Sequence, residues 1–165
     1  MDTTTLVEKW REVVDSPYLR DLPFKLELNE NGKVEFTMSP ATNRHSRWQF
    51  RIGALLEREL GGEASVECSI LTRQGVKVAD VVWYSSAFLE RYGEATPYPQ
   101  APELCVEIAS PSNSAEELRE KIHLYLEAGA LEVWIVRPEG TVESYGSEGR
   151  RAQSVLGVAI PSFAL

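Results

Sequence analysis

A β-α-β unit between Leu104 and Val136 is the feature of this sequence that most constrains its fold. The apolar run LCVEIA, residues 104–109, reads as a strand. Ser114 and Glu117 form a capping box that opens the helix AEELREKIHLYLEAG, and LEVWIV follows directly as a second strand. Because a helix that crosses over between two successive strands leaves them parallel, the sequence predicts a mixed sheet covered by helices.

The segments around this unit complete a mixed α/β pattern. Thr5 and Glu8 resemble a capping box at the start of a first helix, and Asn43 can cap a second helix. The runs FKLEL and KVEFTM alternate around NENG, which is typical of a hairpin. The other expected elements are helices over 6–14 and 44–60, strands over 65–71 and 76–84, and short strands from 141 onward. We predict a single α/β (α+β) domain over 1–165, with an α-β-β-β-α-β core, an N-terminal hairpin and C-terminal strands.

Charge and cysteine content limit the classes of function. The net charge of −8 argues against a protein that coats nucleic acid by bulk electrostatics, although a local basic groove is compatible with it. Cys68 and Cys105 lie in separate strand-like segments without metal-binding spacing, as expected of reduced thiols in the cytoplasm. The sequence has no signal-peptide pattern and no apolar run of about 18 residues. We expect a cytoplasmic protein that is not attached to a membrane.

Two of the predicted strands each carry one acid in an apolar setting. Asp80 lies in VKVADVVWY, and Glu107 in LCVEIA shares its face with the small residues Cys105 and Ala109. An ionised carboxylate is costly to bury alone, and two that meet raise each other's pKa. A divalent cation between them would remove both costs, and oxygen ligands suit Mg²⁺. The same pattern arises when strand-end acids face solvent or an arginine, so that alternative stays open.

Lys121 adds a cation close to the two acids. The apolar stripe of its helix runs through Leu118, Ile122 and Tyr125, and at 100° per residue Lys121 lies at the edge of that stripe. Its ammonium can therefore reach the rim of the buried face, one helix after Glu107. A single lysine in such a position often only covers apolar surface with its aliphatic chain. A functional role of Lys121 is therefore a hypothesis that depends on its lying close to Asp80 and Glu107.

These residues carry a resemblance to a known family. Asp80, Glu107 and Lys121 in an α-β-β-β-α-β order resemble the PD-(D/E)XK nuclease superfamily, which has the restriction-endonuclease-like fold. More narrowly, MSPATNRHS, VADVVWYS, PELCVEIASPSNS, LREKIHLYLEAGALEVWIVRPEG and VESY resemble the Uma-type branch of restriction endonucleases, from about Leu22 to the C-terminus. The superfamily pattern has a lysine two residues after the second acid, where this chain has Ala109. The resemblance to the Uma-type branch implies that Lys121 takes that role.

The resemblance implies a metal-dependent endonuclease that hydrolyses phosphodiester bonds of nucleic acid, above all DNA. Asp80 and Glu107 would bind Mg²⁺, with Mn²⁺ as a substitute, and Lys121 would complete the catalytic set. His45 matches a histidine of the Uma-type branch and could contact phosphate or position a water, although a histidine near a helix end often makes only a local hydrogen bond. Cutting two strands needs two sites, so a homodimer is expected.

Three arginines of the second predicted helix are candidates for phosphate contacts. Arg44, Arg47 and Arg51 follow i, i+3, i+7 spacing, so they share one face of the helix. Such a stripe could track a nucleic-acid backbone, and Arg73 and Lys77 are further candidates. A solvated face paired with nearby glutamates explains the stripe equally well.

Two other functions stay open at this point. Ala109 and the overall acidity favour a nuclease-fold protein without catalysis, which would act as a nucleic-acid-binding or assembly module. A metal-dependent hydrolase with a small phosphorylated substrate is the second, although the sequence has no glycine-rich phosphate loop and no HxxxH motif.

Overall fold

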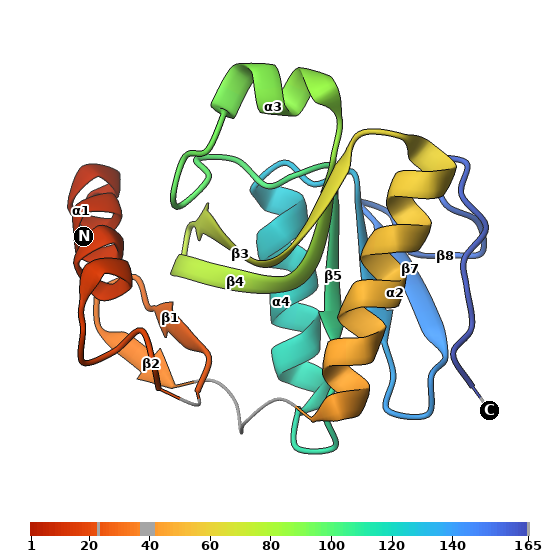
Figure 1. Cartoon of the computed structure of the whole chain (residues 1–165), viewed down its shortest axis with the longest axis horizontal. Coiled ribbons are helices and arrows are strands. Elements are labelled where there is room, and N and C mark those ends of the chain that lie inside the picture. The colour runs from red at the N-terminus through yellow and green to blue at the C-terminus, as the bar shows by residue number, and fades with distance from the viewer. Residues whose placement is uncertain (23, 37–41, 165) are drawn as a thin grey trace.

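The predicted β-α-β unit forms the centre of the sheet (Figure 1). The computed structural model describes residues 1–22, 24–36 and 42–164. Strands β5 (Leu104–Ile108) and β6 (Glu132–Val136) pair in parallel, and helix α4 (Ala115–Glu127) crosses over between them. The Ser114 hydroxyl accepts from the Glu117 N–H at 3.0 Å, and the Glu117 carboxylate accepts from the Ser114 N–H at 2.8 Å. The parallel pair and the capping box are therefore confirmed.

Antiparallel strands extend the sheet on both sides of this unit. Among the described residues the sheet has eight strands, with the order β2-β1-β4-β5-β6-β7-β8 and with β3 paired to β4. The remaining strands are β1 (Leu26–Leu28), β2 (Val34–Phe36), β3 (Glu63–Thr72), β4 (Gly75–Tyr84), β7 (Val142–Gly146) and β8 (Gly149–Arg151). The predicted mixed sheet, N-terminal hairpin and C-terminal strands are confirmed. Thr37 and Met38, which the hairpin prediction included, lie outside the described residues.

Helices cover the two faces of the sheet. Helix α2 (Asn43–Leu60) packs on the face that carries Val81, Val106 and Trp134, and α4 packs on the face of Cys105 and Ile135. Figure 1 shows α2 in front of the central strands and α4 behind them. The shorter helices are α1 (Thr3–Asp15) and α3 (Ser86–Tyr92). Among the described residues, no helix combines the length and the apolar character that crossing a bilayer requires.

Two of the predicted helix caps are wrong. Helix α1 begins at Thr3 because the Asp2 carboxylate accepts from the Thr5 N–H at 3.1 Å and from the Thr5 hydroxyl at 2.7 Å. Thr5 is thus a donor to the cap and not the cap itself. In α2 the Thr42 hydroxyl accepts from the His45 N–H at 3.1 Å, so Thr42 is the cap and Asn43 is the first helical residue.

The sheet splits where β1 and β5 share one edge of β4. Strand β1 pairs with β4 at Val76, and β5 pairs with it only from Val81 onward. Between these pairings, side-chain carboxylates accept from the strands' N–H groups: Glu27 Oε1 from Val78 at 3.0 Å, and Asp80 Oδ2 from Ile108 at 2.7 Å. Acids are therefore built into the sheet at the split, because buried N–H groups need acceptors.

Candidate active site

Asp80 and Glu107 come together at this split in the sheet. Asp80 is 4% exposed and Glu107 is 6% exposed. Both contact the same ammonium group, because Lys25 Nζ lies 2.7 Å from Asp80 Oδ1 and 3.8 Å from Glu107 Oε2. The two acids on neighbouring strands thus share one pocket, as their positions in the sequence suggested, and one cation lies between them.

Lys121 reaches the same pocket from α4. Its Nζ lies 3.3 Å from both carboxylate oxygens of Glu107 and 2.9 Å from Glu27 Oε1. The Tyr125 hydroxyl, one helical turn further on, donates to Glu107 Oε1 at 2.6 Å. Ala109 is buried in the apolar cluster beneath α4, and Lys121 comes from the helix that covers it. The structure therefore brings Asp80, Glu107 and Lys121 into one network of contacts.

Lys25 and Glu27 of the N-terminal hairpin are the site residues that the sequence reading missed. Glu27 is 2% exposed, and the side chain of Lys25 is 8% exposed. The alternation in FKLEL places both on one face of a strand, which is the only sequence signal for them. Since the period of two does not say which face is buried, the pattern alone could not assign these charges to the interior.

The buried network is balanced in charge. Lys77 Nζ lies 3.7 Å from Glu27 Oε2 and 3.9 Å from Glu35 Oε2. Around the split in the sheet, the described residues place three buried carboxylates against three ammonium groups, those of Glu27, Asp80, Glu107, Lys25, Lys77 and Lys121. Ionised groups are tolerated at such depth when each has a partner, and here each one has.

The environment moves the pKa values of the two central acids in opposite directions. Burial by itself raises the pKa of Asp80, but Lys25 and His45 more than offset this and hold it below its ordinary value of 3.8. Burial dominates at Glu107, whose pKa is raised above 4.5 in spite of Lys121 and Lys25, with Asp80 adding to the rise. Asp80 is therefore the firmly charged acid, and Glu107 is the acid that takes up a proton more readily.

The pKa directions predict how stability changes with pH. Glu27 and Asp80 have lowered pKa values, so their charged forms stabilise the fold above about pH 4, and acid removes this contribution. The pKa values of Lys25 and Lys121 are raised, because the effect of their acidic partners outweighs that of burial. The stabilisation that these two charges provide is therefore complete below pH 10.5 and is lost as the pH rises above the raised pKa values. Protonation of Glu107 in acid stabilises the fold, because its pKa is raised. This is one group, whereas Glu27 and Asp80 both destabilise the fold when they are protonated.

We therefore expect the melting temperature to fall on acidification from about pH 6 to about pH 3, and thermal unfolding followed by circular dichroism would measure it. Asp80→Asn should make this decrease smaller, because the variant has one depressed carboxyl fewer. A melting temperature that is constant across this range would contradict the assignment of these charges.

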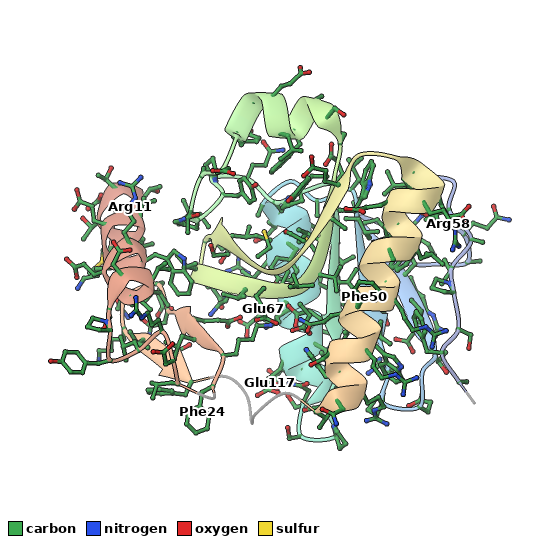
Figure 2. All side chains as sticks on the ribbon, viewed as in Figure 1. Arg11, Phe24, Phe50, Arg58, Glu67 and Glu117 are labelled. Atoms are coloured by element: carbon green, nitrogen blue, oxygen red, sulfur yellow. The ribbon has the colours of Figure 1, made fainter. Side chains whose placement is uncertain are left out.

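His45, Asp80 and Glu67 form a second group of converging donor atoms. The Nε2 atom of His45 lies 3.6 Å from Asp80 Oδ1, and one ligand atom from each of the three residues lies within 4.8 Å of the others. Gln49, one turn after His45, donates to Glu67 Oε1 at 2.7 Å and to the backbone oxygen of Asp80 at 3.0 Å. In Figure 2, Glu67 lies beside β4 in the middle of the molecule.

Glu67 is held in an unfavourable backbone conformation. It lies between the pairs Val66–Val81 and Cys68–Ala79 of β3 and β4 and has a φ of 52°, in the left-handed region that residues with a Cβ rarely adopt. Such a conformation costs about 1–3 kcal/mol and persists only where the surroundings enforce it. Nothing in SVECSIL distinguished Glu67 from an ordinary strand residue, so it was missed.

The donor set at the site fits a divalent cation. The carboxylates of Asp80 and Glu107 offer oxygen ligands and already contact one cationic group, and His45 and Glu67 add a nitrogen and a further carboxylate on the Asp80 side. Mg²⁺ takes carboxylate oxygens, and Mn²⁺ also accepts an imidazole nitrogen. Among the described residues, Asp80 with Glu107, or Asp80 with His45 and Glu67, could hold such an ion.

The arginine stripe lies on another side of α2. Taken at 100° per residue, the mean direction of the stripe is roughly 145° from that of His45 and Gln49. The Arg44 guanidinium lies 5.0 Å from the Trp48 ring and donates to the Pro138 carbonyl at 3.0 Å, and Arg51 lies 5.1 Å from the Phe163 ring. A role of Arg44, Arg47 and Arg51 in phosphate contacts stays a prediction, and it would concern this flank and not the acid pocket.

The chain is similar to known proteins in its fold and in its sequence family. No curated protein matches the chain. A crystal structure of a "putative nuclease belonging to DUF820" from Anabaena variabilis ATCC 29413 is 23% identical, covers 78% of this chain and 73% of its own, and superposes with a TM-score of 0.60. This likeness shows that the two chains share a fold. The family described as "Uma2: Putative restriction endonuclease" matches residues 10–158. The resemblance to the Uma-type branch is thus confirmed, and the chain belongs to the Uma2 family.

Proposed function

We propose that this protein is a metal-dependent endonuclease that hydrolyses phosphodiester bonds, with DNA as the first candidate substrate. The observation that carries the proposal is the convergence of Asp80 and Glu107 on one cation position, with the Lys121 ammonium on the adjoining side of Glu107. Membership of the family described as "Putative restriction endonuclease" and the fold shared with a protein described as a "putative nuclease" support it. Mg²⁺ as the ion, a cytoplasmic location and a homodimer are parts of the same proposal.

Asp80 and Glu107 would hold the ion, with His45 as an additional donor. When bound, Mg²⁺ or Mn²⁺ supplies the Lewis acidity that phosphodiester hydrolysis needs. Asp80 suits this role because its pKa is depressed, so it stays charged in weak acid. The Tyr125 hydroxyl fixes the orientation of Glu107 by donating to Oε1 at 2.6 Å.

Lys121 would stabilise negative charge that develops on the phosphate oxygens or orient the attacking water. Its ammonium is held by two acids from different strands, Glu27 at 2.9 Å and Glu107 at 3.3 Å. A donor that is oriented before the reaction costs little reorganisation when the charge develops. Lys121 of α4 thus would provide the ammonium that Ala109, the residue directly after β5, cannot provide.

A nuclease fold without catalysis is the second candidate function. The cavity of about 570 Å³ that adjoins the acids is also lined by Glu35, Glu117 and Glu120, all of them exposed. Lys25, Lys77 and Lys121 also line this cavity, but they are paired with the buried acids, so the exposed carboxylates would repel phosphate groups unless further cations are bound. This observation favours a role as an assembly module if the protein does not take up a divalent cation.

The experiment that tests the proposal is a cleavage assay on duplex DNA, single-stranded DNA and RNA with Mn²⁺, Mg²⁺ or a chelator. Asp80→Asn should lower the rate by about 10³-fold or more, because it removes the charge of a candidate ligand whose pKa is depressed. The matched control is Glu143→Gln, which removes a carboxylate paired with Arg137 at 2.8 Å outside this network and should keep the activity. No cleavage of any substrate with either ion would refute the proposal and favour the non-catalytic alternative.

A further inference from the structure

We propose that Lys25 is a displaceable internal cation, whose ammonium holds Asp80 and Glu107 together and gives up that position when a divalent cation binds. This inference rests on the proposed function, since it concerns how the same site is regulated. It goes beyond that function by assigning a role to the N-terminal hairpin, which supplies none of the residues that the sequence pattern of the site contains.

The position of the Lys25 ammonium carries the argument. It lies 2.7 Å from Asp80 Oδ1 and 3.8 Å from Glu107 Oε2, which come from the two adjacent strands β4 and β5. An ion held by both carboxylates would occupy the space beside these same oxygens, because Asp80 Oδ2 already accepts from the Ile108 N–H and Glu107 Oε1 from the Tyr125 hydroxyl. An ammonium and a divalent ion repel each other and cannot share that space.

The charge balance explains why Lys25, and not another lysine, would leave. The described network already pairs three carboxylates with three ammonium groups, so two further positive charges would leave an excess in a buried place. Lys121 keeps Glu27 as a partner at 2.9 Å, and Lys77 contacts Glu27 and Glu35. The acid closest to Lys25 is Asp80, which is itself a candidate ligand of the divalent cation.

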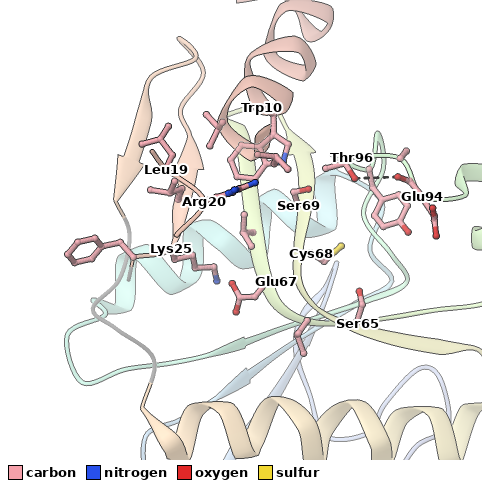
Figure 3. A pocket seen from close by; sticks show the side chains of 18 residues that line it. Trp10, Leu19, Arg20, Lys25, Ser65, Glu67, Cys68, Ser69, Glu94 and Thr96 are labelled. Atoms are coloured by element: carbon pink, nitrogen blue, oxygen red, sulfur yellow. Dashed lines mark hydrogen bonds between the residues drawn. The ribbon is translucent and has the colours of Figure 1, made fainter. Parts of the chain in front are cut away.

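A second carboxylate is available to Lys25 once it leaves Asp80. Figure 3 shows the Lys25 ammonium directed toward the Glu67 carboxylate, across the cavity between α1 and β3. Glu67 is exposed and accepts from Gln49, so it retains further capacity to accept a hydrogen bond. A short movement of the flexible lysine stem can therefore transfer the ammonium from one acid to the other.

The displacement would also change the shape of the site. One cavity, of about 610 Å³, lies between α1 and β3, and the other, of about 570 Å³, lies over the start of α4. Of the residues that the structure describes, Lys25 alone lines both. Movement of its side chain from Asp80 toward Glu67 would therefore change the boundary between the two cavities.

The test is the affinity of Lys25→Met for Mn²⁺, measured by titration calorimetry on the full chain without nucleic acid. Removing the competing ammonium should tighten Mn²⁺ binding by at least about tenfold over the unaltered protein. Lys77→Met is the control, because it removes the same charge from the network without touching Asp80 or Glu107, and its gain should be much smaller. Thermal unfolding with and without Mn²⁺ is a second readout, and Mn²⁺ should stabilise Lys25→Met more than the unaltered protein.

The outcomes separate this inference from the proposed function. Equal Mn²⁺ affinities for Lys25→Met and the unaltered protein, with binding lost in Asp80→Asn, would overturn the role of Lys25 and leave the metal site intact. No Mn²⁺ binding by any variant would overturn both. If Lys25→Met folds only when Mn²⁺ is present, the ion replaces the ammonium and the inference is supported. If Mn²⁺ does not restore its fold, the inference fails.

Discussion

Glu107→Gln should lower metal-dependent cleavage by about 10³-fold or more and change the melting temperature by only a few degrees. Glutamine keeps the shape of the side chain and an oxygen that can accept from the Tyr125 hydroxyl, which now lies 2.6 Å from Oε1. The charge that it removes is a costly one, because burial and Asp80 raise the pKa of Glu107. A buried carboxylate that is retained at such a cost is expected to act in the reaction and not to stabilise the fold.

Asp80→Asn is the informative comparison for stability. Asp80 has a lowered pKa and accepts from the Lys25 ammonium and the Ile108 N–H, both at 2.7 Å, so its charge stabilises the fold. We expect the melting temperature of Asp80→Asn to fall clearly below that of Glu107→Gln, while both variants lose cleavage. Thermal unfolding and a cleavage assay on the same preparations would show this. A Glu107→Gln protein that unfolds several degrees below Asp80→Asn, or that still cuts, would contradict the assignment.

The sequence predicted those parts of the fold that depend on local pattern. The capping box of Ser114 and Glu117 and the two flanking apolar runs determine the parallel pair of β5 and β6, and all three can be read within 35 residues or so of chain. The alternation in LCVEIA also predicted which residues lie beside Glu107, and Cys105 and Ala109 do lie in the cluster beneath α4. These features can be predicted because a capping box and the alternation of side chains along a strand both involve residues that are close in sequence.

The rest of the site depends on contacts between distant parts of the chain. Lys25 and Asp80 are separated by 55 residues, and Lys121 and Glu27 by 94. Strand β1 has only three residues, so its alternation cannot decide whether its charged face meets solvent or the interior. Its charges are buried because β1 and β5 share one edge of β4 and leave a split there, which is a property of the whole sheet.

The arginines of α2 also show how far the sequence alone can predict the site. Their spacing predicted correctly that Arg44 and Arg51 point the same way, and both lie on aromatic rings near the C-terminal segment. A helical period determines which residues share a face, but it does not identify the neighbour of that face. The face of α2 that reaches the acids carries His45 and Gln49, and the order of the strands beneath the helix decides this.

Lys121→Met should abolish cleavage and lower the melting temperature by about 10 °C. Without the ammonium, Glu27 and Glu107 lose a partner at 2.9 and 3.3 Å while both stay buried. Breaking one side of a buried ion pair costs about 3–5 kcal/mol, and in a chain of this size each kcal/mol lowers the melting temperature by about 2–4 °C. The loss of cleavage in this variant alone could follow from unfolding, so it does not by itself assign a role to the lysine.

The double variant Lys121→Met/Glu27→Gln separates the two effects. It removes one charge of each sign. Lys25 still contacts both Asp80 and Glu107, Lys77 still contacts Glu35, and glutamine keeps an oxygen that can accept from the Val78 N–H. We expect most of the lost melting temperature to return, because no buried carboxylate is left without a cation. Cleavage should stay absent, since the ammonium that would act on the phosphate is still missing. If the double variant cuts nucleic acid at the rate of the unaltered protein, Lys121 is only the counter-ion of Glu27, and the lysine of the reaction must be sought elsewhere, with Lys25 as the nearest ammonium to both acids.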